Sequence, residues 1–176
     1  MSKSTLLRLL LLLPVGLAPA YAGPVTFATT ASQLCFGSSG CGVAGQIVGG
    51  TLSVQFEPIP ASTVNVSGQS FASLGQLVIT CVGGGTACGN QSLAGLNLFI
   101  NITQSAPSFG NGSFVGGAIT GSIRGTASNA TIAWSVPNTF GIGATTYAIA
   151  DNPLALVPPS ANGGVTTIQV QITDPN

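Results

Sequence analysis

Few side chains in this sequence can take part in acid–base or nucleophilic chemistry. The 176 residues contain three Lys or Arg, three Asp or Glu and no His. Two of the basic residues, Lys3 and Arg8, lie near the N-terminus, so Arg124 is the single cationic side chain of residues 23–176. Because a Ser-His-Asp triad needs a histidine, the sequence excludes that constellation.

A pair of carboxylates is the remaining catalytic option, since two acids suffice to hydrolyse a glycosidic bond. The candidates are Glu57 and Asp151, because Asp174 lies close to the end of the sequence. Glu57 precedes Pro58 at the exit of an expected strand, and Asp151 stands in the turn sequence Asp151-Asn152-Pro153. Such positions are typical of solvated loop acids. We therefore predict that the protein is not an enzyme and has no catalytic residues.

Metal, cofactor and nucleic-acid binding have little support. Asp151 with Asn152, and Asp174 with Asn176, offer one carboxylate each, whereas Ca²⁺ takes about 6–8 oxygens, usually from several acids. Nucleic acids are bound by several Lys or Arg side chains, which Arg124 alone does not supply. We predict no metal site, no cofactor and no nucleic-acid partner. Arg124 falls on an expected strand, where it would pair with the Glu57 carboxylate or face solvent.

The first 22 residues have the features of a secretory signal peptide. A basic start is followed by a short apolar run, and Ala20-Tyr21-Ala22 places small residues where signal peptidase cleaves. We predict cleavage after Ala22, with cleavage after Ala20 as the alternative. Residues 23–176 then form a single exported domain, extracellular or on the cell surface. No second long apolar run follows, so we expect no transmembrane segment in the mature chain.

Four cysteines are present: Cys35, Cys41, Cys81 and Cys88. An even number in an exported chain indicates disulfides. The spacing favours two local bridges, Cys35–Cys41 and Cys81–Cys88, each closing a small glycine-rich loop. Three pairings are open on sequence grounds, and a four-thiolate zinc site is the alternative.

Apolar and polar residues alternate along most of the mature chain. Leu52, Val54 and Phe56 share one face of such a run, and a period of two is that of a strand with one buried and one wet face. We predict an all-β fold, a two-sheet antiparallel β-sandwich of jelly-roll or Ig-like type with about nine strands, or alternatively a β-barrel. Phe56 and Trp134 are expected in the core. The expected strands are residues 24–30, 46–57, 62–67, 71–80, 94–104, 113–126, 129–136, 145–150 and 165–173.

Several segments together resemble a known group of exported proteins. They are Cys35-Phe36-Gly37 with Cys41-Gly42, and residues 71–75, 132–137, 152–160 and 164–169. On these segments the chain resembles exported bacterial β-sandwich proteins of the PEP-CTERM type, including relatives with interchangeable surface anchors. The resemblance implies a role at the cell surface or in an exopolysaccharide matrix, and it assigns no functional residues. Such proteins usually end in a Pro-Glu-Pro motif, an apolar helix and a basic tail. Residues 173–176, where such a tail would begin, depart from that pattern, and the anchoring route stays open.

Two functions fit a neutral, β-rich exported domain. The first is a non-enzymatic structural or adhesive domain of the bacterial cell surface or biofilm matrix, associating into a homo-oligomer or filament through sheet edges that lack Lys. Residues 23–30 would then be a loose segment donated to a neighbour's sheet. The alternative is a carbohydrate-binding module acting on exopolysaccharide. Its candidate contacts are the aromatic and amide residues Phe99, Phe114, Tyr147, Asn97 and Asn101.

Overall fold

The computed structural model describes residues 23–30, 34–36, 46–135 and 137–175. This part of the chain forms sixteen strands, all paired antiparallel within three sheets, and one short 3-10 turn, η1 (Asn162–Gly164). The prediction of an all-β fold is confirmed. The predicted signal peptide, residues 1–22, lies outside the described residues.

One large sheet has seven strands. Its order is β15-β12-β9-β8-β1-β5, and β2 also pairs with β8. The long strands β8 and β9 pair along most of their length and form the centre of this sheet. Its strands are β1 (Pro24–Thr30), β2 (Leu34–Phe36), β5 (Ser62–Asn65), β8 (Leu96–Ala106), β9 (Gly110–Thr120), β12 (Thr131–Trp134) and β15 (Leu154–Ala155).

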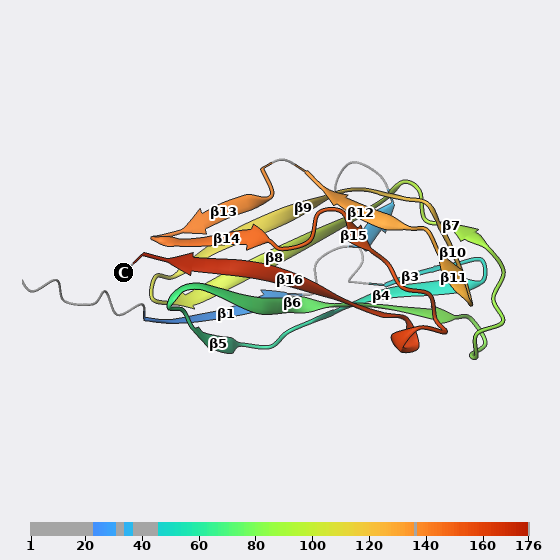
Figure 1. Ribbon diagram of the computed structural model, residues 1–176, viewed down its shortest axis with the longest axis horizontal. Helices are drawn as coiled ribbons and strands as arrows, with labels where there is room; N and C mark the ends of the chain where they lie inside the picture. The colour runs from blue at the N-terminus through green and yellow to red at the C-terminus, as the bar shows by residue number, and fades with distance from the viewer. Residues whose placement is uncertain (1–22, 31–33, 37–45, 136, 176) are drawn as a thin grey trace, which may run out of the picture.

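The second large sheet has six strands in the order β13-β14-β16-β6-β4-β3, and a three-stranded sheet, β11-β10-β7, lies at one end of the molecule (Figure 1). The six are β3 (Gln46–Gly49), β4 (Leu52–Pro58), β6 (Gly68–Cys81), β13 (Thr139–Ile142), β14 (Thr145–Ile149) and β16 (Val165–Asp174). The small sheet consists of β7 (Gln91–Ser92), β10 (Ser122–Arg124) and β11 (Ala127–Ser128).

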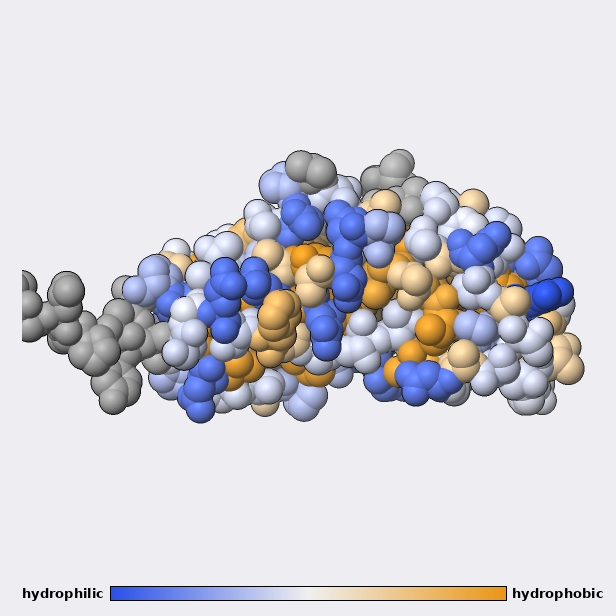
Figure 2. Space-filling model, viewed as in Figure 1, coloured by the Kyte–Doolittle hydropathy of each residue, from blue (hydrophilic) through white to orange (hydrophobic). Residues whose placement is uncertain are grey.

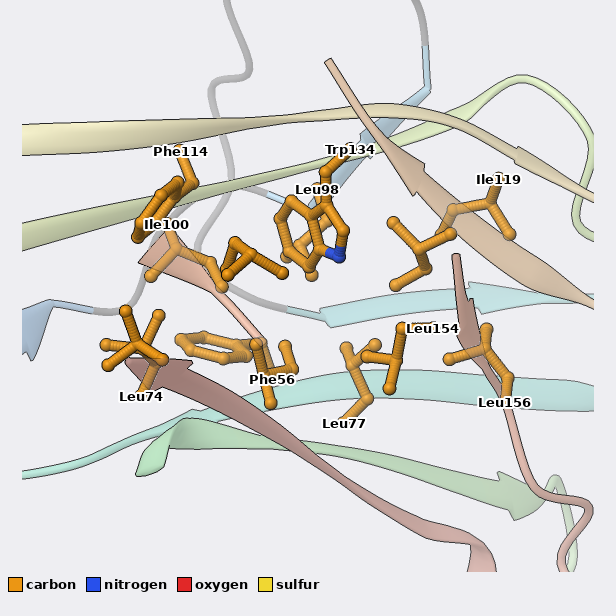
Figure 3. Close-up of a cluster of buried hydrophobic side chains, with 14 of the residues drawn as sticks. Phe56, Leu74, Leu77, Leu98, Ile100, Phe114, Ile119, Trp134, Leu154 and Leu156 are labelled. Carbon is orange, nitrogen blue, oxygen red and sulfur yellow. The ribbon is translucent and has the colours of Figure 1, made fainter. Parts of the chain in front are cut away.

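The hydrophobic core lies between the two large sheets. Figure 3 shows Phe56 and Leu77 of the six-stranded sheet pointing toward Leu98 and Trp134 of the seven-stranded sheet. The exposed fractions of Phe56 and Trp134 are 2% and 4%, so their predicted place in the core is confirmed. Alternation produces this arrangement, because every second side chain of a strand points to the same face.

The predicted strand count of about nine is wrong for a physical reason. The five strands that sequence analysis did not anticipate, β2, β7, β11, β13 and β15, have two to four residues, which is too short for a periodic pattern to emerge. In addition, two expected strands are each divided in two. Residues 46–57 form β3 and β4, because the chain turns at Gly50, where φ is +58°, and residues 113–126 contain the end of β9 and all of β10, which Gly121, with φ of +85°, separates. Within the described chain neither large sheet closes on itself, since each ends in edge strands.

The N-terminal segment 23–30 is not loose. Residues Pro24–Thr30 form β1, which lies between β5 and β8 in the seven-stranded sheet. Val25 and Phe27 are buried, with exposed fractions of 0% and 1%. The prediction that this segment is a donor strand for a neighbouring molecule is therefore wrong: its inward-facing side chains belong to the core of its own domain.

Candidate functional site

The two carboxylates considered for catalysis occupy different surroundings. Glu57, on β4, is half-buried, and its Oε2 accepts a hydrogen bond of 2.7 Å from Nε2 of Gln76 on β6. Asp151 is exposed and follows β14. A shallow hollow of about 270 Å³ lies beside Glu57, and Glu57 is the one acid among the described residues that line it. The structure thus supplies no second carboxylate in this hollow to act with Glu57.

Arg124 does not lie with Glu57. It is exposed at the end of β10 and borders a hollow of about 190 Å³ with polar neighbours such as Asn90 and Ser128. Of the two expectations for this side chain, pairing with Glu57 or facing solvent, the second is confirmed.

The disulfide prediction is confirmed for one pair. Cys81 at the end of β6 is bonded to Cys88, and the bridge closes the loop that contains Gly83, Gly84 and Gly85. Cys41 lies outside the described residues, so the pairing of Cys35 with Cys41 stays a prediction.

Tyr147 and Phe114, two of the three aromatic residues expected to contact sugar, are core residues, and that part of the prediction is wrong. Their exposed fractions are 0% and 3%. The ring of Tyr147 stacks on Phe140 with a centroid separation of 5.2 Å, and Phe140 in turn lies 4.6 Å from Phe114. A ligand has no access to rings packed in this way.

The Tyr147 hydroxyl belongs to a buried polar network. It donates a 2.6 Å hydrogen bond to Oε1 of Gln104, whose Nε2 donates to the Ser108 carbonyl at 2.9 Å. Burial, and secondly the negative charge of Asp174, raise the pKa of Tyr147 well above its ordinary value. The tyrosine therefore stays neutral and acts as a donor that positions the Gln104 amide. Its role is structural.

The outer face of the seven-stranded sheet carries the remaining residues of the sugar-binding prediction. Asn97, Phe99 and Asn101 alternate with buried neighbours on β8 and so point to this face. Phe99 is half-buried. Next to Asn101 is a shallow hollow of about 360 Å³, whose described lining is Asn101, Thr103, Asn111, Gly112 and Ser113. This face offers short amides and hydroxyls but no freely exposed ring among those residues.

The outer face of the six-stranded sheet carries an exposed aromatic ring that sequence analysis did not select. Phe71, on β6, is 63% exposed. Gln171 of β16 lies directly opposite Phe71 in the strand register, and Gln169 lies opposite Ser73. The amide of Gln171 donates to Oε1 of Gln69 at 3.2 Å. Glutamine amides therefore flank the ring on two neighbouring strands.

A bulge in β6 connects this ring with the hollow beside Glu57. The register between β6 and β16 shifts between Ile168 and Gln169, opposite Gly75 and Ser73. Gly75 has φ of +131°, and the hydroxyl of Ser73 bonds both to its amide, at 3.1 Å, and to its carbonyl, at 3.3 Å. As a result Ser73 and Gln76, on either side of the bulge, both line the hollow.

The signal for this face was present in the sequence. The alternation of residues 165–173 placed Gln169 and Gln171 on the polar side of a strand, and residues 71–80 were expected to form another strand. Which strands are paired, and in which register, is a long-range property that alternation does not contain. Without that register, Phe71 could not be placed beside the two glutamines.

Comparisons with family models, with curated proteins and with solved structures found no match to this chain. Among the described residues, no three His, Cys, Asp or Glu side chains gather as a metal site would require. In the same part of the chain, no helix has the length and apolar character needed to cross a bilayer.

Proposed function

We propose that the protein is an exported, non-enzymatic structural or adhesive domain of a bacterial cell surface or biofilm matrix. One observation carries the proposal: the described acids lie on three different segments of the chain, while both outer sheet faces present hydroxyls and amides. The Glu57 carboxylate accepts a hydrogen bond from the Gln76 amide, Asp151 is in a loop, and the side chain of Asp174 is buried, with an exposed fraction of 2%. Such surfaces interact through shape and neutral hydrogen bonds rather than through proton transfer.

The finer fold assignment belongs to the same proposal. We assign the domain, residues 23–176, to the two-sheet sandwiches of jelly-roll or Ig-like type, because the two large sheets share one core. Exposure to an oxidising compartment fits the Cys81–Cys88 disulfide. Removal of residues 1–22 as a signal peptide, and a place outside the cell, complete the proposal.

Self-association through a sheet edge is part of the structural role that we propose. β5 is an edge strand of the seven-stranded sheet, and its sequence Ser-Thr-Val-Asn contains no charge. Natural edge strands are commonly protected by Lys or Pro, which prevent pairing with another chain. An uncharged edge leaves that pairing open.

Size-exclusion chromatography with light scattering, and negative-stain images of residues 23–176, test this association. We expect oligomers whose mass rises with concentration, and we expect Thr63→Lys, on the exposed side of β5, to reduce it. Thr146→Lys is the matched control, because Thr146 is also exposed but lies on β14, an inner strand. A strict monomer at high concentration, or equal effects of both substitutions, would contradict assembly through this edge.

Carbohydrate binding is the second candidate function, and one observation favours it. Phe71 exposes most of its ring on a sheet face that also carries Gln169 and Gln171. Aromatic rings together with a few placed polar groups are the usual means of holding an organic ligand. An extracellular polysaccharide is the partner that we propose for this function.

A further inference from the structure

The exposed ring of Phe71 is the starting point, although one exposed ring is ordinary on a protein surface. Phe109, in the β8–β9 loop, is even more exposed, at 78% against 63% for Phe71. The surroundings distinguish the two. Phe71 lies within the long strand β6, with polar side chains of β16 opposite it, whereas Phe109 lies in a connecting loop.

Glutamine amides border the ring on its own strand and on the next one. Gln171 is in register with Phe71, and Gln69, two residues before Phe71 on β6, accepts a hydrogen bond from Gln171. An amide group can donate and accept at the same time, so it can bind two adjacent hydroxyl groups of a sugar. A flat ring with amides at its border thus matches a pyranose, whose faces are apolar and whose rim carries hydroxyls.

The hollow beside Glu57 continues the same surface along β6. From Phe71 to Gln76 the strand advances about 15 Å at about 3.3 Å per residue, which is enough for more than one sugar unit. Ser73 lies between the ring and the hollow, and it faces the same side as Phe71 because it is two residues further along. The Glu57 carboxylate accepts from Gln76 through Oε2, and a carboxylate has further acceptor sites for sugar hydroxyls.

We infer that this outer face of the six-stranded sheet is a binding site for an uncharged glycan chain, with the ring of Phe71 as its platform. The inference deepens the carbohydrate-binding candidate function and rests on it. The site consists of Gln69, Phe71, Ser73, Gln76, Gln169, Gln171 and Glu57.

The charge of this outer face favours an uncharged glycan over an anionic one. Glu57 is the one ionisable member of the site, so an anionic polymer gains no ion pair there and is repelled by this carboxylate. Figure 2 shows hydrophilic residues interspersed with hydrophobic ones over the side of the molecule that faces the viewer in Figure 1. A protein partner that covered this face would have to satisfy each glutamine amide that it removed from water, whereas sugar hydroxyls supply such partners in rows.

Binding measurements on residues 23–176 test the inference. The probes are an insoluble neutral glucan in depletion assays and soluble neutral glucans in calorimetry, with alginate as the anionic polymer. We expect the neutral glucans to bind in preference to alginate. We expect that binding to be insensitive to salt, because no ion pair contributes to it.

Phe71→Ala should weaken glucan binding roughly tenfold or more, since truncating a central aromatic contact has an effect of that size. Phe71→Tyr should retain binding, because it keeps the ring. Phe109→Ala is the matched control, an exposed ring removed outside the site, and it should leave binding unchanged. The urea midpoint of each variant should equal that of the wild type, because both rings are exposed.

Four results would overturn the site. The first is absence of binding to every neutral glucan, and the second is preference for alginate. The third is equal weakening by Phe71→Ala and Phe109→Ala. A loss of self-association in Phe71→Ala would assign the face to contact between copies and would also overturn the inference. If the wild type binds no glucan but still assembles in a concentration-dependent way, the structural role stands and only the glycan site falls.

Discussion

The outer faces of the two large sheets both carry hydroxyl and amide side chains, with Glu57 as an acid on the six-stranded face, but they differ in side-chain size and backbone regularity. The seven-stranded sheet presents short groups, such as Thr103 opposite Asn111. The six-stranded sheet presents the long amides of Gln169 and Gln171, together with the exposed ring of Phe71.

This difference in side-chain size corresponds to two roles of an uncharged protein surface, hydrogen bonding to solvent and contact with a ligand. Short hydroxyls and amides satisfy solvent, and they offer little contact area to a ligand. A ring flanked by long amides offers area and direction at once, which is what a binding site needs. The bulge at Gly75 adds a hollow to this second face. A substitution at Gly75 is therefore expected to have the largest effect on the difference between the two faces.

Gly75→Ala should destabilise the domain by about 3 kcal/mol. A Cβ at this position would lie 2.5 Å from the Glu57 carbonyl oxygen and 2.7 Å from Cζ of Phe56. Its φ of +131° is also a conformation that residues with a side chain rarely adopt. Urea unfolding followed by circular dichroism measures the change.

Gly84→Ala is the control for the backbone term alone. Gly84 also has positive φ, +85°, but nothing lies within 4 Å of a Cβ built there. We expect a loss of about 1 kcal/mol from the strained conformation. Equal losses at Gly75 and Gly84 would show that the close approach of β4 to the bulge contributes nothing to the effect.

The buried hydrogen-bond network of Tyr147 should make stability fall as the pH rises in the alkaline range. Burial and Asp174 raise the pKa of Tyr147 above the ordinary 10.0. Below pH 10 both folded and unfolded chains hold the phenolic proton, so this contribution is fully present. As the pH rises further, the unfolded chain releases the proton while the folded chain keeps it, and stability falls. Urea unfolding at pH 7, 9, 10.5 and 11 measures this decline.

Tyr147→Phe isolates the phenol, because the one other tyrosine is Tyr21, within the predicted signal peptide, and residues 23–176 contain no Lys. At neutral pH the variant should lose about 1–2 kcal/mol, since Oε1 of Gln104 no longer receives its hydrogen bond. Its stability should then change little between pH 9 and 11. An alkaline decline as steep as that of the wild type would contradict the assignment to Tyr147.

The long strands of the fold were predictable because each has a local alternation of apolar and polar residues. Residues 165–173 alternate without interruption, and β16 occupies Val165–Asp174. The short edge strands were not predictable, since β15 has two residues and forms only because Leu154 and Ala155 come to lie beside β12. For such segments tertiary pairing, not local pattern, decides the structure.

The candidate site also has one part that could be predicted from the sequence and one part that could not. The absence of a histidine and the single arginine of residues 23–176 could be read from the sequence, and so could the amides of Gln169 and Gln171. Phe114 and Tyr147 were misplaced because alternation gives the two faces of a strand but not which aromatic residues face the core. Phe71 became informative only through its register with Gln171.

The smallest effects on stability and on glucan binding are expected from substitutions on the outer face of the seven-stranded sheet. Near-zero effects there would support the difference between the two faces. Asn111→Ala and Ser113→Ala remove exposed polar groups beside the hollow of that face. Each should change the free energy of unfolding by less than about 0.5 kcal/mol, as surface substitutions usually do. Each should also leave glucan binding as it is, measured by the same calorimetry as for Phe71→Ala. A weakening of glucan binding in these variants, with Phe71→Ala unaffected, would move the glycan from the amide-bordered ring to the row of short side chains. The size of the polar groups would then not be what distinguishes the two faces.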